Sequence, residues 1–416
     1  MRIERPGYLD FLIRSKDRQI IKAVSGIRRS GKSTLFEIYR DWLCGNGVAA
    51  EQIISIDFED IDNAHLTDYR KLYDHIKLRL LPDRMNYIFL DEIQHVEQYE
   101  LAVDSLFIRK NVDLCITGSN AYFMSGELAT LLTGRYVELK MLPLSFAEYC
   151  EGLALYAPDK PLSKMEKYAS YCSESSFPYT LQLYGRSRDV REYLEGIYNS
   201  IMQKDVARRL RVSDWMMMES VARFVFDNIG NLTSTRKIAN TMTSAGRKID
   251  QKTVEKYIKG LMDSLIVYQA KRYNIKVKQY LATLEKYYVA DVGLRRYLLG
   301  AANADQGHIL ENIVYLELLR RGYEVFVGSI PKGEVDFVAQ NGEGCLYCQV
   351  AATVLDESVL QRELAPLYQI NDHFPKLLIT LDEVGAGTSH NGIRQVNALD
   401  WLLNTQFAHD RMNENH

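Results

Sequence analysis

The sequence predicts an α/β fold whose N-terminal part is an open parallel sheet with helices on both faces. A glycine-rich loop at residues 26–33 lies between an apolar segment (19–25) and a segment with helical spacing of apolar residues (33–43). Three further apolar segments, at 53–58, 86–90 and 112–117, each end in polar residues. Strands of a parallel sheet end in this way when a ligand binds at their carboxyl edge.

Length and composition limit the class of protein. The 416 residues are too many for one ordinary core, so we expect two or three domains. A net charge of −3 argues against a nucleic-acid-binding surface that covers the whole molecule, although a local basic region remains open. We expect a cytoplasmic protein, because there is no long apolar run or signal peptide and the six cysteines are scattered.

The segment Gly-Ile-Arg-Arg-Ser-Gly-Lys-Ser at residues 26–33 has the spacing of a phosphate-binding loop. Glycines let the main chain approach a phosphate, and the N–H groups at the start of the next helix face the anion. Lys32 would reach the β- and γ-phosphates of ATP, and the Ser33 hydroxyl would bind Mg²⁺. Arg28 and Arg29 would touch the nucleotide or stay solvated. The predicted nucleotide contacts in the loop are Gly26, Ile27, Arg28, Arg29, Ser30, Gly31, Lys32, Ser33 and Thr34.

Two acidic residues follow the apolar segment at 86–90. Asp91 would hold Mg²⁺ together with Ser33, and Glu92 would polarise the water that attacks the γ-phosphate. The alternative is an ordinary strand end with two solvated carboxylates. The phosphate-binding loop earlier in the chain favours the catalytic interpretation.

Four segments together resemble a large group of prokaryotic AAA-type P-loop NTPases: GIRRSGKSTL, YIFLDEIQ, ITGSNA and LLTGRYVELKMLPLSFAEY. The resemblance covers residues 6–382, and members of the group carry a C-terminal domain distantly similar to restriction endonucleases. It implies an ATP-binding core in which Asn120 contacts the γ-phosphate or its water, with Ser119 as second choice. Arg135 would be an arginine finger acting in cis or from a neighbouring subunit, or a surface arginine in an ion pair. One departure is Ser175-Ser176 where the group usually has two glycines.

We expect four parts along the chain. Residues 1–150 would form the AAA-type P-loop ATPase core and 151–225 a helical lid or linker. Residues 226–300 would form a winged helix-turn-helix, because two helices (234–242 and 250–266) precede an apolar strand (266–273). Residues 301–416 would form an inactive PD-(D/E)xK-nuclease-like α/β domain.

Charge favours a DNA contact in the basic segment, residues 231–290, without excluding a protein-interaction role. Twelve basic and four acidic side chains give this segment a charge of +8 within a chain of −3. The basic residues are Arg236, Lys237, Arg247, Lys248, Lys252, Lys256, Lys259, Lys271, Arg272, Lys276, Lys278 and Lys286.

The nuclease resemblance rests on Glu311 and Asp336, which match acids of that core, and Glu334 lies two residues before Asp336. A nuclease of this type would carry Glu or Gln, any residue, then Lys, but the chain has Gln349-Val350-Ala351. Alanine cannot orient water, so we expect no cleavage unless Lys332 moves in. The three acids would persist as a weak metal site, as structural acids or as part of a nucleic-acid surface.

The expected function is a slow, Mg²⁺-dependent ATPase that acts as a nucleotide-driven switch on an unknown protein partner or on DNA. One alternative is a DNA-binding regulator or scaffold in which ATP is structural. The other is a metal-dependent nuclease.

Overall fold

The computed structural model describes residues 2–121, 132–158, 161–300, 305–342 and 344–404, without the side chains of residues 282 and 283. The chain divides into two compact units. The first comprises Met1–Pro143 with Asp263–Leu265, and the second comprises Leu144–Met262 with Ile266–His416.

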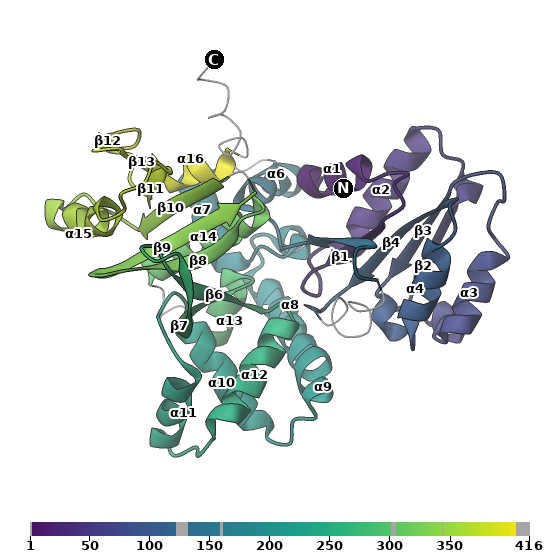
Figure 1. Cartoon of the computed structure of the whole chain (residues 1–416), viewed down its shortest axis with the longest axis horizontal. Coiled ribbons are helices and arrows are strands. Elements are labelled where there is room, and N and C mark those ends of the chain that lie inside the picture. Colours follow the sequence, from purple (N-terminus) through teal and green to yellow (C-terminus); the bar gives the residue numbers. More distant parts are fainter. Residues whose placement is uncertain (1, 122–131, 159–160, 301–304, 343, 405–416) are drawn as a thin grey trace. The chain divides into compact units, whose positions relative to one another are not determined.

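The first unit contains a five-stranded parallel sheet in the order β2-β3-β4-β1-β5, which confirms the predicted parallel α/β core (Figure 1). The polar end of β4 lies between the loop after β1 and the acids at the end of β3, because β4 separates these two strands. The strands are β1 (Ile21–Ser25), β2 (Ile53–Asp57), β3 (Asn86–Asp91), β4 (Val112–Gly118) and β5 (Tyr136–Lys140).

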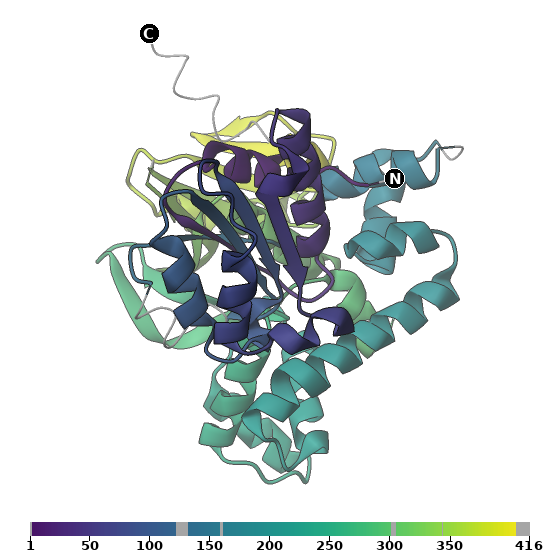
Figure 2. The same ribbon diagram turned by 90° about the vertical axis from the view of Figure 1, so that its right-hand side faces the viewer.

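Helices cover both faces of this sheet (Figure 2). Alternate strand residues face opposite sides, so Tyr87 and Phe89 pack with α1 and α2, whereas Ile88 and Leu90 pack with α3 and α4. The helices are α1 (Pro6–Arg14), α2 (Lys32–Gly45), α3 (Tyr69–Lys77) and α4 (Tyr99–Phe107), with short 3₁₀ turns η1 (Ala50–Gln52), η2 (Ile61–Leu66) and η3 (Ile93–His95).

The second unit begins with helices. The region predicted as a helical lid or linker is mostly helical where the structure describes it, and it contains a π-helical segment, η6 (Ile201–Ala207), between two α-helical parts. The elements here are α6 (Phe146–Tyr156), α7 (Lys164–Glu174), η5 (Pro178–Leu183), α8 (Ser187–Ser200) and α9 (Arg208–Leu210).

Three helices and a hairpin follow: α10 (Trp215–Asp227), α11 (Thr235–Ser244), α12 (Gln251–Asp263), β6 (Val267–Asn274) and β7 (Gln279–Val289). Of these, α11, α12 and β6 stand in the order predicted for the two helices and the strand. Ser234 caps α11 by accepting from the Lys237 N–H. The hairpin also joins the C-terminal sheet, because β6 pairs in parallel with β8. The assignment as a winged helix-turn-helix stays a prediction.

An eight-stranded mixed sheet in the order β12-β13-β11-β10-β9-β8-β6-β7 forms the rest of the second unit (Figure 1). One apolar cluster joins β9 and β10 to α15. The helices are α13 (Val292–Leu299), α14 (Gln306–Arg320), α15 (Glu357–Tyr368) and α16 (Ala398–Leu403), and the strands are β8 (Glu324–Ile330), β9 (Gly333–Asn341), β10 (Gly344–Ala351), β11 (Lys376–Thr380), β12 (Ser389–His390) and β13 (Ile393–Asn397). In the part of the chain that the structure describes, no helix has the length and apolar character needed to span a bilayer.

Candidate functional site

The loop between β1 and α2 has the backbone geometry that its glycines allow. Gly31 precedes α2 with φ 102°, a conformation that is costly for residues with a side chain. Gly26 is required for a different reason: a Cβ atom there would lie 2.4 Å from the carbonyl oxygen of Met141. A larger residue at either position would therefore distort the loop.

Lys32 is buried and folds back onto this loop. Its Nζ lies 3.1 Å from the Gly26 carbonyl oxygen and 3.2 Å from Glu92 Oε1. The buried Ser30 Oγ has no hydrogen-bond partner among the described residues. The loop thus holds a cation and an unused hydroxyl, both of which a phosphate could satisfy.

The other predicted loop residues differ in exposure. Ile27 is buried, Thr34 is half-buried, and Arg29 and Ser33 are exposed. Arg28 lies 2.5 Å from Glu59 Oε1, so it is partnered within the first unit and not simply solvated.

Asp91 ends β3 and is buried beside the loop. Its carboxylate accepts hydrogen bonds from the hydroxyls of Thr117 and Ser33. Burial raises the pKa of Asp91, although these hydrogen bonds act in the opposite direction. The structure therefore brings together Ser33 and Asp91, the two predicted Mg²⁺ ligands.

Glu92 follows with φ 53°, and its carboxylate faces Lys32. Burial by itself would raise the pKa of Glu92, but the Lys32 ammonium and hydrogen bonds from Gln94 and Ser119 lower it to about 2. Glu92 is therefore ionised at neutral pH.

Sequence reasoning missed Gln94. Its Nε2 donates to Glu92 Oε2 and lies 3.2 Å from Ser119 Oγ, so it joins the ends of β3 and β4. The only available signal was its position two residues after Glu92. Asn120 is buried two residues after the end of β4, and its neighbour Ser119 hydrogen-bonds to Glu92.

Arg135 does not fit an arginine finger acting in cis, and we correct that interpretation. It directly precedes β5, where Tyr136 pairs with Ile21 at the start of β1, whereas the loop follows the other end of β1. At about 3.3 Å per residue these two edges are roughly 15 Å apart. The Arg135 guanidinium instead pairs with Asp104 and lies over the Phe107 ring.

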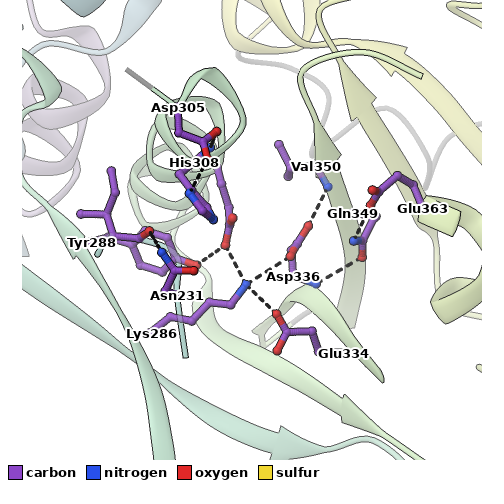
Figure 3. A network of polar contacts seen from close by, with 12 residues as sticks. Asn231, Lys286, Tyr288, Asp305, His308, Glu334, Asp336, Gln349, Val350 and Glu363 are labelled. Carbon is purple, nitrogen blue, oxygen red and sulfur yellow. Dashed lines mark hydrogen bonds and ion pairs between the residues drawn. The ribbon is translucent and has the colours of Figure 1, made fainter. Parts of the chain in front are cut away.

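The second unit contains a separate polar cluster, drawn in Figure 3. The Lys286 ammonium lies 2.9 Å from Glu311 Oε1, 2.9 Å from Glu334 Oε1 and 3.2 Å from Asp336 Oδ1. The lysine beside the acids is thus Lys286, whereas Lys332 is exposed. Lys286 must also be removed from the basic surface that we assigned to residues 231–290, because its side chain is only 3% exposed.

Comparisons with known proteins agree with the first unit's fold. A family model described as "AAA domain" matches residues 18–150, and one described as "Domain of unknown function (DUF8612)" matches residues 165–305. The solved structure of the "walker-type atpase paby2304" of Pyrococcus abyssi has a TM-score of 0.50 at 14% identity, covering 71% of this chain and 96% of that one. At this identity the likeness concerns the fold alone.

Two relatives match most of the chain. An "Uncharacterized protein" of Haemophilus influenzae is 39% identical over 402 residues, covering 96% of this chain and 98% of the relative. "Uncharacterized protein MJ1544" of Methanocaldococcus jannaschii is 29% identical over 360 residues, covering 83% and 77%. The chain therefore belongs to the same family as the Haemophilus influenzae protein, with which it shares nearly its full length, and within it residues 18–150 match an AAA domain.

Proposed function

We propose that the first unit binds ATP with Mg²⁺ and hydrolyses it slowly, and that the nucleotide state controls how the protein holds a partner. One observation carries this proposal: Lys32, Ser33, Asp91 and Glu92 meet at the carboxyl edge of one parallel sheet. This is the edge at which open α/β sheets bind their ligands.

The residues present fit Mg-ATP. Because Gly26 has no side chain, the loop passes close to the Met141 carbonyl oxygen without a clash. The buried Ser30 hydroxyl lacks a hydrogen-bond partner among the described residues. The main-chain N–H groups of the loop would hold the phosphates, and Lys32 would exchange its contact with the Gly26 carbonyl for phosphate oxygens. Ser33 and Asp91 would hold the magnesium ion, which supplies positive charge for the phosphates when bound.

Glu92 would accept a proton from the attacking water. Its low pKa keeps it ionised, and Gln94 and Ser119 fix the orientation of its carboxylate. The ion pair with Lys32 has to open before the lysine reaches a phosphate, which supports a slow basal rate. Asn120, buried two residues after the end of β4, is our candidate for contacting the terminal phosphate or its water.

Nucleotide binding and γ-phosphate release by the full chain test this proposal separately. We expect Lys32→Ala to lose ATP binding. Glu92→Gln should keep binding but lose roughly 10²-fold or more of its hydrolysis rate, because the proton acceptor is absent. Glu51→Gln, at an exposed glutamate of the same unit, is the matched control and should behave like wild type. Equal rates for wild type and Glu92→Gln would refute the ATPase assignment.

The exposed cations of the second unit favour DNA as the partner. Lys252, Lys256 and Lys259 are all exposed on α12, the helix in the recognition position of the predicted winged helix. We expect duplex DNA to bind with an affinity that falls as salt rises.

Two variants, each with three lysines replaced by alanine, test the DNA contact. Log affinity falls as log salt rises, and replacing Lys252, Lys256 and Lys259 together by alanine should make this negative slope shallower by about 2–3. The control replaces Lys71, Lys77 and Lys110, three exposed lysines of the first unit, and should leave the slope unchanged. Equal effects of both triple variants would exclude α12 as the contact. DNA affinity indifferent to ATP would favour a regulator in which the nucleotide is structural.

A further inference from the structure

The Lys286 ammonium occupies the point at which three carboxylates converge. We call Glu311, Glu334 and Asp336 the carboxylate cluster; Glu311 comes from α14 and the other two from β9. Each has a carboxylate oxygen within 3.2 Å of the Lys286 ammonium. Figure 3 shows Glu334 and Asp336 pointing toward this lysine. Burial alone would lower the pKa of Lys286, but the three carboxylates outweigh it and raise that pKa. The lysine is therefore a permanent cation between the acids.

The resemblance to nucleases implies a divalent cation at these acids, and the side chains present do not fit one. Glu311 Oε1 also accepts from the Tyr288 hydroxyl at 2.6 Å, and Asp336 Oδ2 accepts from the Val350 N–H at 3.0 Å. These oxygens already have hydrogen-bond donors. Across the described ranges, no group of three or more His, Cys, Asp or Glu side chains is arranged to hold a metal ion.

The neighbouring strand supplies no further ligand. Gln349 on β10 has an amide where a carboxylate would add charge, and its Nε2 donates to Glu363 Oε2 at 2.9 Å. Its Oε1 accepts from the Asp336 N–H at 3.3 Å. Both ends of the Gln349 amide are thus used within the protein.

We propose that Lys286 is the resident cation of the carboxylate cluster, so that the wild-type cluster takes no divalent metal, and that removing the ammonium uncovers a divalent-cation site. Without the lysine, three buried or half-buried carboxylates would repel one another at short range. Carboxylate oxygens are hard ligands that Mn²⁺ and Mg²⁺ accept, so a divalent ion would then relieve the repulsion.

Contacts independent of the ammonium hold the cluster in place. The Asn312 side chain exchanges two hydrogen bonds with the backbone of Val289, at 2.8 and 2.9 Å. The rings of Tyr288 and Tyr315 stack with centroids 4.2 Å apart. These contacts fix β7 to α14, so a Lys286→Met variant, which keeps the apolar stem, should fold.

Titration of the nucleotide-free full chain with Mn²⁺, with free Mn²⁺ counted by electron paramagnetic resonance, tests the proposal. We expect Lys286→Met to bind one more Mn²⁺ per chain than wild type, and Lys286→Met with Asp336→Asn to lose that ion again. Lys271→Met, at an exposed lysine of β6, is the matched control and should bind as wild type does. Equal binding by wild type and Lys286→Met would overturn the proposal.

A second comparison does not depend on how Lys286→Met folds. Wild type and Asp336→Asn should bind the same number of Mn²⁺ ions, because the wild-type cluster takes none. An Asp336-dependent ion in wild type would show that the cluster holds metal beside Lys286, and the proposal would fail. Mg²⁺- or Mn²⁺-dependent cleavage of plasmid DNA that disappears in Asp336→Asn would have the same meaning.

Discussion

Lys22 and Asp113 form a fully buried ion pair between β1 and β4. This pair allows us to predict how a single substitution changes the free energy of unfolding. Lys22 Nζ lies 2.7 Å from Asp113 Oδ1, and the two side chains are 0% and 1% exposed. Lys22→Met would leave a buried carboxylate without its cation, so we expect the free energy of unfolding to fall by about 3–5 kcal/mol. Denaturant unfolding of the purified variant measures this loss.

The matched control removes both charges. Asp113→Asn keeps an oxygen for the Asp17 N–H, which lies 2.7 Å from Asp113 Oδ2. Lys22→Met with Asp113→Asn should therefore recover most of the lost stability. A double variant no more stable than Lys22→Met would show that the lysine contributes mainly by packing.

The sequence could predict those site residues that a local motif brings together. Lys32 and Ser33 lie within one loop, and Asp91 and Glu92 end one strand, so spacing alone indicated their chemistry. The neighbour of Glu311 could not be predicted in this way. Lys286 lies 25 residues earlier, on β7, and reaches the acid because β7 packs against α14, a contact without a local signal in the sequence.

For Arg135, the local sequence pattern suggested a role that the sheet topology excludes in cis. The strand β5 begins directly after this residue, but the sequence did not show at which edge of the sheet that strand begins. In a parallel sheet the starts of all strands lie at the edge opposite to the ligand. Knowing the pairing of β5 with β1 would have excluded the in-cis contact.

At the scale of elements, the turn between α7 and η5 contains a strained serine. Ser175 has φ 124° and ψ 155°, a region that only glycine adopts readily, and it lies where the group that the sequence resembles usually has glycine. The turn packs closely against α13, because a Cβ on Gly293 would lie 2.5 Å from Ser175 Cα. The departure seen in the sequence therefore falls on a position with a glycine-like backbone.

Ser175→Gly should stabilise the second unit by about 1 kcal/mol. Relief of the backbone strain contributes roughly 1–3 kcal/mol, and loss of the two Ser175 Oγ hydrogen bonds, one from the Phe177 N–H at 3.1 Å and one to the Asp291 carboxylate, offsets about 1 kcal/mol. Ser176→Gly is the control. It removes the Ser176 Oγ bond to the buried Asp291, at 2.6 Å, without relieving positive φ, and should destabilise by about 1–2 kcal/mol. A lower unfolding midpoint for Ser175→Gly would show that its hydrogen bonds outweigh the strain.

Helices and strands were easier to predict than their pairing. The apolar runs at 86–90 and 112–117 predict strands, and β3 and β4 occupy them. The strand at 266–273 was also identified, but its place beside β8 was not, because local periodicity carries no information about the partner strand.

At the scale of the whole molecule, the chain has two compact units with separate sheets. We therefore expect nucleotide to change the thermal unfolding of one unit without changing that of the other. The first unit's core lies on the two faces of its own five-stranded sheet, and the second unit has a core of its own on β9, β10 and α15. Units with independent cores tend to unfold in separate steps. We therefore expect two transitions when the full chain is heated in a calorimeter.

Mg-ATP should raise the midpoint temperature of only one of these transitions. A ligand at 100 times its dissociation constant adds about 2.7 kcal/mol to the unit that binds it, which for a unit of this size corresponds to roughly 5–10 °C in Tm. Lys32→Ala should abolish that shift and leave the other transition unchanged, whereas Ser175→Gly should move only the transition that ATP leaves alone. A single transition that ATP raises as a whole would mean that the two units unfold as one cooperative block. Nucleotide binding would then be coupled directly to the helices and hairpin that carry the basic segment.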